Sequence, residues 1–115
     1  MTPEFAEIYG NKVRLRVCGL CWQGDSLLLV KHKMGDKGLW APPGGGIEYG
    51  ESVDYALKRE FLEETGLKIA VNKFLFGCEF IKKPLHAVEL FFDVEKVAGV
   101  LRGGYDREFQ LIEKA

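Results

Sequence analysis

The sequence lacks any long apolar run and any excess of one charge. Its longest aliphatic run is Leu27-Leu28-Leu29-Val30, far shorter than a membrane span or the core of a secretion signal. Sixteen basic and seventeen acidic side chains leave a formal net charge of -1. No bulk field therefore draws the chain onto nucleic acid or an anionic membrane, and an anionic ligand must be held by a local site.

Cysteine is scarce as well. The chain has three cysteines, an odd number without secretory features, so we expect reduced thiols, no disulfide framework and a cytoplasmic location. Cys18 and Cys21 form a C-x-x-C pair, but no second pair or histidine stands at zinc-finger spacing. We therefore expect both to be small core residues on a strand rather than metal ligands.

Glycine, by contrast, is abundant. It accounts for 14 of 115 residues, and six of these lie within positions 35–50. Neither a collagen period nor a low-complexity tract explains the excess. The backbone of this stretch must therefore turn tightly or approach another group closely.

No repeat or linker divides the chain, so we expect a single domain over residues 1–115. β-Forming residues and turn signals predict strands at 13–22, 27–31, 69–71, 74–81 and 86–94, with a candidate strand edge at 110–112. The first two strands should form a hairpin. A helix is predicted over 52–65, with Ser52 as its N-cap and Gly66 as its C-terminal stop. Four aromatic residues are expected in the core rather than stacked on a base: Trp22, Trp40, Phe76 and Phe80.

The predicted helix breaks the amphipathic pattern in its second half. At about 100° per residue, its apolar residues Val53, Ala56, Leu57 and Phe61 share one arc that should face the core. Three glutamates point into or beside this same arc, whereas Leu62 points outward. These glutamates are Glu60, Glu63 and Glu64.

A ligand is needed to compensate for this arrangement. Carboxylates three and four residues apart repel one another, and in the last turn they also oppose the helix dipole. Hard oxygen ligands of this kind suit Mg²⁺ or Mn²⁺. Because Mg²⁺ usually binds through a few carboxylates together with substrate phosphates, the pattern favours phosphate chemistry.

The residues around this helix resemble the Nudix box of MutT-like hydrolases, G-x5-E-x7-R-E-U-x-E-E-x-G-U, in which U is a bulky apolar residue. Every fixed position is present over residues 45–67. The matching residues are Gly45, Glu51, Arg59, Glu60, Phe61, Glu63, Glu64, Gly66 and Leu67. With the preceding glycines and hairpin, the resemblance extends over nearly the whole chain.

The resemblance implies an α/β (α+β) fold, an α/β/α sandwich around a mixed β-sheet. Family members finish with a strand and a second helix, and we expect this chain to lack them. The implied activity is hydrolysis of the diphosphate linkage in a nucleoside diphosphate derivative, with Mg²⁺ or Mn²⁺ as cofactor. Alternatives are a non-catalytic nucleotide-binding sensor and a hydrolase or isomerase of a non-nucleotide diphosphate. A homodimer is the expected assembly.

The resemblance also implies roles for individual residues. The metal ligands would be Glu60, Glu63, Glu64 and the backbone carbonyl of Gly44. Glu51 and Arg59 would brace the loop and orient the carboxylates, although Arg59 also stands at the i,i+4 spacing of a surface pair with Glu63.

Two further roles carry alternatives. The general base would be Glu63 or Glu64, or else Glu108 in a later loop, where Asp106 competes for the role and a solvated loop charge is the simpler interpretation. Lys31 and Lys33 are candidate phosphate ligands, together with the backbone of Gly45 and Gly46. The two lysines could equally protect an exposed strand edge.

Overall fold

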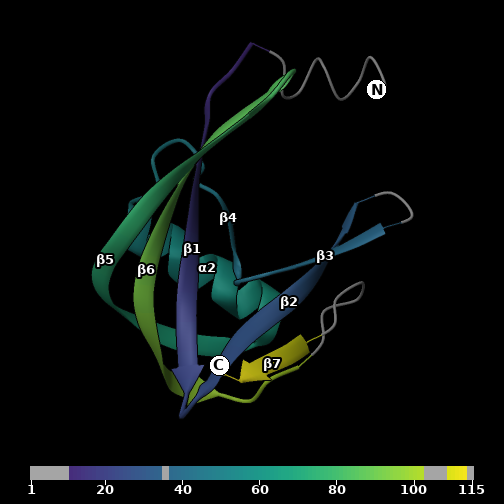
Figure 1. Cartoon of the computed structure of the whole chain (residues 1–115). Helices are drawn as coiled ribbons and strands as arrows, with labels where there is room; N and C mark the ends of the chain where they lie inside the picture. Colours follow the sequence, from purple (N-terminus) through teal and green to yellow (C-terminus); the bar gives the residue numbers. More distant parts are fainter. Residues whose placement is uncertain (1–10, 35–36, 103–108, 114–115) are drawn as a thin grey trace.

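The computed structural model describes residues 11–34, 37–102 and 109–113 of the chain. One helix crosses a face of a twisted sheet in this part (Figure 1). The elements are β1 (Arg14–Gln23), β2 (Ser26–Met34), β3 (Lys37–Ala41), β4 (Gly44–Gly46), α2 (Val53–Thr65), β5 (Leu67–Lys82), β6 (Leu85–Gly99) and β7 (Phe109–Glu113). The main path of the sheet is β3-β2-β1-β6-β5, with β4 paired to β1 and β7 paired to β2. The pairing of β1 with β6 is parallel and the others are antiparallel, so the sheet is mixed, as predicted.

The predicted hairpin of β1 and β2 is present but short. Gly24 takes a left-handed φ of 60° in the connecting turn, and the strands pair only at Trp22↔Leu27 and Gln23↔Ser26. Farther along, β4 pairs with β1 at Arg16↔Gly46, so β1 and β2 diverge. This divergence brings the glycine-rich segment into the sheet.

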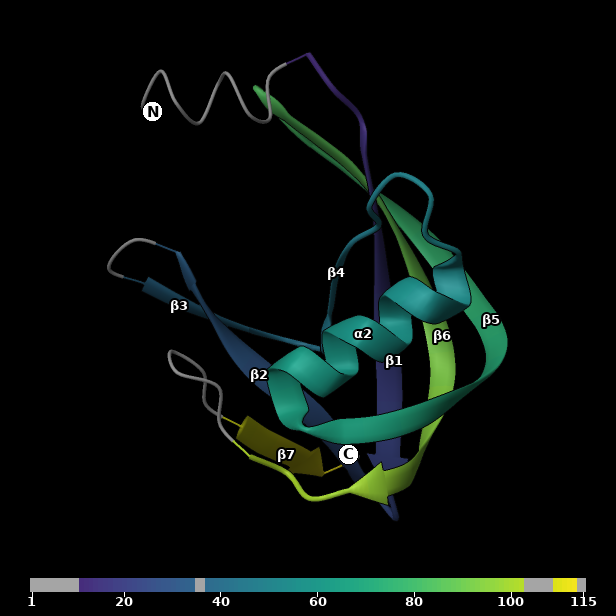
Figure 2. The same ribbon diagram turned by 180° about the vertical axis from the view of Figure 1, so that it is seen from behind.

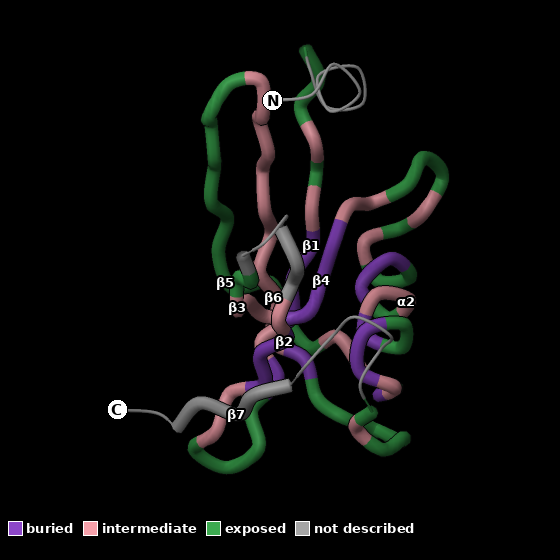
Figure 3. The backbone as a smooth tube through the Cα atoms, turned by 90° about the vertical axis from the view of Figure 1, so that its right-hand side faces the viewer, coloured by how far each residue is buried: buried purple, intermediate pink, exposed green. Residues whose placement is uncertain are grey.

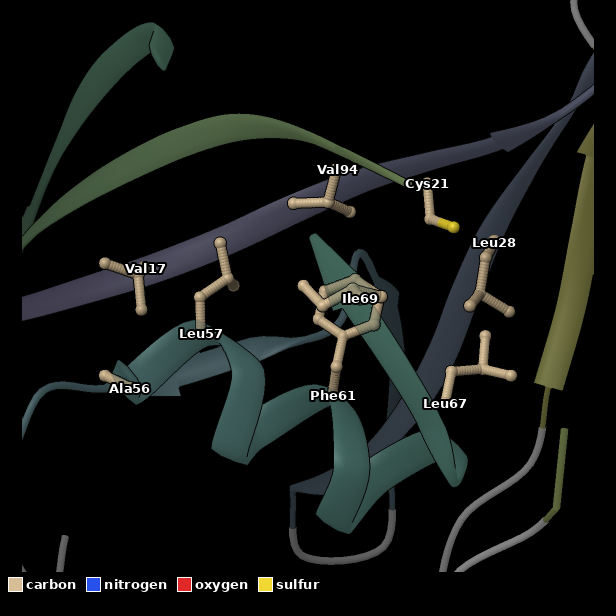
Figure 4. Packing of buried hydrophobic residues seen from close by; sticks show 9 residues of the cluster. All are labelled: Val17, Cys21, Leu28, Ala56, Leu57, Phe61, Leu67, Ile69 and Val94. Atoms are coloured by element: carbon tan, nitrogen blue, oxygen red, sulfur yellow. The ribbon is translucent and has the colours of Figure 1, made fainter. Parts of the chain in front are cut away.

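Helix α2 supplies three of the nine residues of the hydrophobic core cluster. Figure 2 shows it lying across β1 and β6, and Figure 4 shows its apolar side chains pointing at the sheet. Ala56, Leu57 and Phe61 are fully buried and pack with Val17 and Val94. The predicted core arc of the helix is therefore confirmed.

Both predicted helix ends are also confirmed. The Ser52 side chain accepts a hydrogen bond of 3.1 Å from the Tyr55 N–H, and Gly66 ends the helix in the left-handed region at φ 78°. Cys18 and Cys21 are buried on β1, as expected, at 3% and 1% exposure.

The β5–β6 hairpin corrects one expectation. Residues 69–71 and 74–81 were predicted as separate strands, but they form one continuous strand, β5. Irregularities at Val71/Lys73 and Phe74/Phe76 each insert a residue, which breaks the alternating pattern without ending the strand.

The predicted core placement of the aromatic residues is wrong for three of them. Trp22, Phe76 and Phe80 are 40%, 46% and 47% exposed, and Trp40 is half-buried. The two phenylalanines lie on β5, the edge strand of the sheet, which α2 covers only near its start. Figure 3 shows the exposed length of this strand in green.

The candidate strand edge at 110–112 is confirmed. It forms β7, which pairs with β2 from Ser26↔Glu113 to Val30↔Phe109. The described residues contain one helix, and none there is long and apolar enough to cross a membrane.

Candidate active site

The glycines of β4 allow the backbone to approach two groups closely. A Cβ on Gly44 would collide with the carbonyl oxygen of Val17 on the paired strand. A Cβ on Gly45 would come within 2.7 Å of the carboxylate carbon of Glu60. The concentration of glycine therefore reflects contact with β1 on one side and with the glutamates of α2 on the other.

The three candidate metal-binding glutamates occupy different environments on α2. Glu64 is 1% exposed, and its Oε2 accepts a hydrogen bond of 2.9 Å from the Gly44 N–H. The side chain of Glu60 is 15% exposed, whereas that of Glu63 is 56% exposed. Leu62 faces outward at 41% exposure, as predicted from the reversed pattern.

Arg59 connects the helix to the glycine-rich loop. Its Nε and Nη2 donate to the two carboxylate oxygens of Glu51 at 2.6 and 2.8 Å. The same guanidinium reaches the Gly46 carbonyl oxygen at 3.4 Å. Because a guanidinium and a carboxylate match in this paired geometry, Arg59 holds the loop against the helix.

The hydrogen bonds between Arg59 and Glu51 stabilise the charged form of both side chains. The bonds to Glu51 raise the pKa of Arg59 above its usual range, despite the opposing effect of burial. The bonds from Arg59, and then the 2.8 Å bond from the Glu48 N–H, lower the pKa of Glu51. The Glu51 carboxylate thus links the loop backbone at Glu48 to Arg59 on the helix through charge-assisted bonds.

The donor set suits a divalent cation, although the carboxylates do not converge on one point. Within the described ranges, no three Asp, Glu, His or Cys side chains gather closely enough to hold a metal ion. However, Arg59 Nη1 contacts the carboxylates of both Glu60, at 2.9 Å, and Glu63, at 3.4 Å. These two groups already share one positive charge, and all the candidate ligands are hard oxygens, so the residues fit Mg²⁺ or Mn²⁺.

A pocket of about 660 Å³ opens beside these residues. Its wall includes Glu51 and Glu60 from the box region, residues 45–67. It also contains two basic residues that the sequence did not single out: Lys12, which precedes β1, and Arg14, the first residue of β1. Their signal was the alternation of basic residues at positions 12, 14 and 16. The remaining lining residues are Val13, Leu15, Gly46, Ile47, Glu48, Tyr49 and Gly50.

The other candidate residues lie elsewhere or outside the described part. The Lys31 Nζ lies 5.9 Å from the centroid of the Trp40 ring on the neighbouring strand β3, and Lys31 does not line the pocket. Lys33 belongs to β2, but its side chain lies outside the description. Glu108 and Asp106 both lie outside the described residues.

Comparisons with known proteins agree with this architecture. A profile of the NUDIX domain matches residues 12–113. An ADP-ribose pyrophosphatase of Methanocaldococcus jannaschii is 34% identical over 93 residues, which cover 78% of this chain and 55% of that protein. The nucleoside triphosphatase NudI of Escherichia fergusonii is 41% identical over 64 residues, which cover 52% of this chain and 45% of that protein.

Solved structures share the fold. A MutT NUDIX hydrolase from Burkholderia pseudomallei superposes with a TM-score of 0.77 at 23% identity, covering 90% of this chain and 84% of that one. The chain spans about half the length of the two curated relatives. Since the family profile covers most of the residues, including the box and its helix, we conclude that this chain belongs to the NUDIX family.

Proposed function

We propose that this domain hydrolyses the diphosphate linkage of a nucleoside diphosphate derivative in a reaction that depends on a divalent metal. The observation that carries the proposal is the buried hydrogen bond between the Glu64 carboxylate and the Gly44 N–H. A carboxylate buried at the helix end and fixed to a glycine strand is costly for stability alone, which supports a role in chemistry. The names of the relatives, an ADP-ribose pyrophosphatase and a nucleoside triphosphatase, support the substrate class.

Glu60, Glu63, Glu64 and the Gly44 carbonyl would hold the metal. Bound Mg²⁺ or Mn²⁺ would neutralise phosphate oxygens and lower the pKa of a coordinated water. Arg59 would position Glu60 through its Nη1 contact while Glu51 holds the guanidinium in place. This arrangement fixes Glu60 and the Arg59 guanidinium before substrate binds, so these two groups need less reorganisation during reaction.

The proton of the attacking water would pass to a carboxylate oxygen. Glu63 is the exposed glutamate of the helix, and Glu64 already accepts the Gly44 N–H, so Glu63 has the better access to water. Glu108 is the competing base. The pH dependence of kcat in Glu63→Gln and Glu108→Gln distinguishes them, since only loss of the base removes the acidic limb of the profile.

Substrate phosphates would lie along the backbone of Gly45 and Gly46, which carry no side chains of their own. Lys31 and Lys33 stay candidate phosphate ligands. For Lys31, this role requires the ammonium to leave the face of the Trp40 ring, an interaction worth about 0.5–1 kcal/mol at an exposed site.

The test is a substrate panel. Nucleoside triphosphates, ADP-ribose, sugar nucleotides and dinucleoside polyphosphates are incubated with the protein in Mg²⁺ and in Mn²⁺, and release of monophosphate or diphosphate is followed. We expect release from at least one class, abolished by EDTA. Binding without release from any class would contradict the proposal and favour a nucleotide sensor, whereas release only from non-nucleotide diphosphates would favour the alternative substrate class.

The remaining features of the proposal concern the whole molecule. We infer a single domain, a small-molecule substrate and a homodimer. We also infer a cytoplasmic location, which rests on the free thiols of Cys18, Cys21 and Cys78.

A further inference from the structure

We propose that Arg14 selects substrates that carry an anionic group beyond the diphosphate at the box carboxylates, which means a third phosphate. This inference rests on the proposed function and names its substrate class. Arg14 would be a specificity-determining residue, and it would favour nucleoside triphosphates over ADP-ribose or sugar nucleotides.

The first support is the geometry of β4. Successive residues of a strand face opposite sides, so Gly45 and Gly46 present their bare Cα atoms in opposite directions. A Cβ on Gly45 would meet the Glu60 carboxylate at 2.7 Å, and a Cβ on Gly46 would meet Arg14 Nη2 at 3.0 Å. A carboxylate and a guanidinium therefore flank the same strand of glycines.

The second support is the shared pocket. Glu60 and Arg14 lie against opposite faces of β4, yet both line the 660 Å³ pocket. Among the described strands β4 pairs with β1 alone, so the pocket passes around the other edge of β4 at Gly46. A substrate held at Glu60 can therefore extend past Gly46 toward Arg14. The end farther from the metal carboxylates is the part that Arg14 would contact.

The third support is the charge of the pocket wall. Its ionisable side chains are two cations, Lys12 and Arg14, and three carboxylates, Glu48, Glu51 and Glu60. Arg59 already neutralises Glu51 through two hydrogen bonds. A divalent cation would be held by Glu63 and Glu64 as well as Glu60, so the charges around the pocket would balance. Lys12 and Arg14 would supply the positive charge beyond the metal site, which favours an anionic group there over a neutral sugar.

Arg16 offers a matched comparison on the same strand. It shares the sheet face of Arg14 because the two are separated by two positions, but its Nε pairs with Glu89 at 3.3 Å, and it does not line the pocket. An effect of general positive charge on β1 would follow from losing either arginine. An effect of phosphate recognition would follow from losing Arg14 alone.

The experiment measures equilibrium binding and needs no turnover. α,β-Methylene-ATP and α,β-methylene-ADP, which differ by the terminal phosphate, are titrated calorimetrically in Mg²⁺ into the wild type, Arg14→Gln, Arg14→Lys and Arg16→Gln. We expect the wild type to bind the triphosphate analogue about tenfold more tightly, because charge-assisted bonds to phosphate are worth at least that factor. Arg14→Gln should remove this preference, Arg14→Lys should keep part of it, and Arg16→Gln should keep all of it.

The outcomes separate this inference from the proposed function. An unchanged preference in Arg14→Gln, an equal loss for both analogues, or no preference in the wild type would overturn the role of Arg14. If the preference depends on Arg14 but no substrate is hydrolysed, the inference stands and the proposed hydrolysis falls. Circular dichroism melts of each variant identify a loss of binding caused by unfolding.

Discussion

The box region and the β5–β6 hairpin are stabilised in different ways. In the box region, polar side chains make specific hydrogen bonds. The Glu64 carboxylate accepts one from the Gly44 N–H, and the Arg59 guanidinium donates two to the Glu51 carboxylate. In the hairpin, a backbone ladder runs from Leu67↔Gly99 to Lys82↔Leu85, and large apolar side chains such as Ile81, 58% exposed, face solvent. The backbone bonds of a ladder do not depend on the side chain, so the hairpin should tolerate substitutions that the box region does not.

The largest expected contrast concerns stability. Phe61→Ala removes a fully buried ring from the centre of the core and should lower the free energy of unfolding by about 3–5 kcal/mol. Phe76→Ala removes a ring that is 46% exposed and stacked on Phe91 at 4.6 Å, and should cost about 1 kcal/mol. Urea denaturation of both variants measures the difference, and equal losses would contradict the division into two kinds of region.

The next effect is on turnover. Glu64→Gln keeps an acceptor for the Gly44 N–H but removes the charge, so kcat should fall at least about 100-fold with only a modest loss of thermal stability. The control is Glu79→Gln in the hairpin, where the carboxylate contacts His86 at 3.0 Å. If Glu64→Gln kept wild-type turnover, or if both variants lost turnover to a similar extent, the difference between the box region and the hairpin would not concern catalysis.

A smaller loss is expected from Arg59→Lys. Lysine keeps the charge but cannot make the two parallel bonds to Glu51, so Glu60 should lose its alignment and kcat should fall about tenfold. Lys58→Gln is the matched control on the same helix, because its exposed pair with Asp54 contributes little. Steady-state kinetics would refute the positioning role if the two substitutions had equal effects.

The smallest perturbation is thiol labelling, which leaves the fold intact. Burial, followed by the Glu89 charge, raises the pKa of Cys18 to about 12, and burial raises the pKa of Cys21. Both therefore lack the reactive thiolate at pH 8, whereas Cys78 on β5 is exposed. We expect one thiol to react rapidly in the native protein, none in Cys78→Ser, and three after unfolding of the wild type; rapid native labelling of Cys18 would contradict its burial.

Much of α2 could be predicted because its signals are local. Ser52 and Gly66 mark its ends, and the apolar arc through Phe61 identifies its buried face. The glutamates were detectable because they interrupt that arc. Strand β4 was not predictable, since glycine has no preference for strands and only pairing with β1 makes these residues extended.

The rest depended on contacts between distant segments. β5 could not be predicted as one strand because inserted residues interrupt its alternation of apolar and polar side chains. The full extent of β7 is defined by its pairing with β2. Arg14 was overlooked for the same reason. Its position on a strand says nothing about which distant segment lies beside it, and that segment, β4 at Gly46, is 32 residues away in the chain.

The most direct test of the central claim is Mn²⁺ binding, followed by the electron paramagnetic resonance signal of the unbound ion. The claim is that the box carboxylates hold a divalent cation, so wild-type protein should bind Mn²⁺ and Glu60→Gln should bind it at least about tenfold more weakly. Glu79→Gln in the hairpin should bind like the wild type. Equal affinity in the wild type and Glu60→Gln, or no binding by the wild type, would contradict the account.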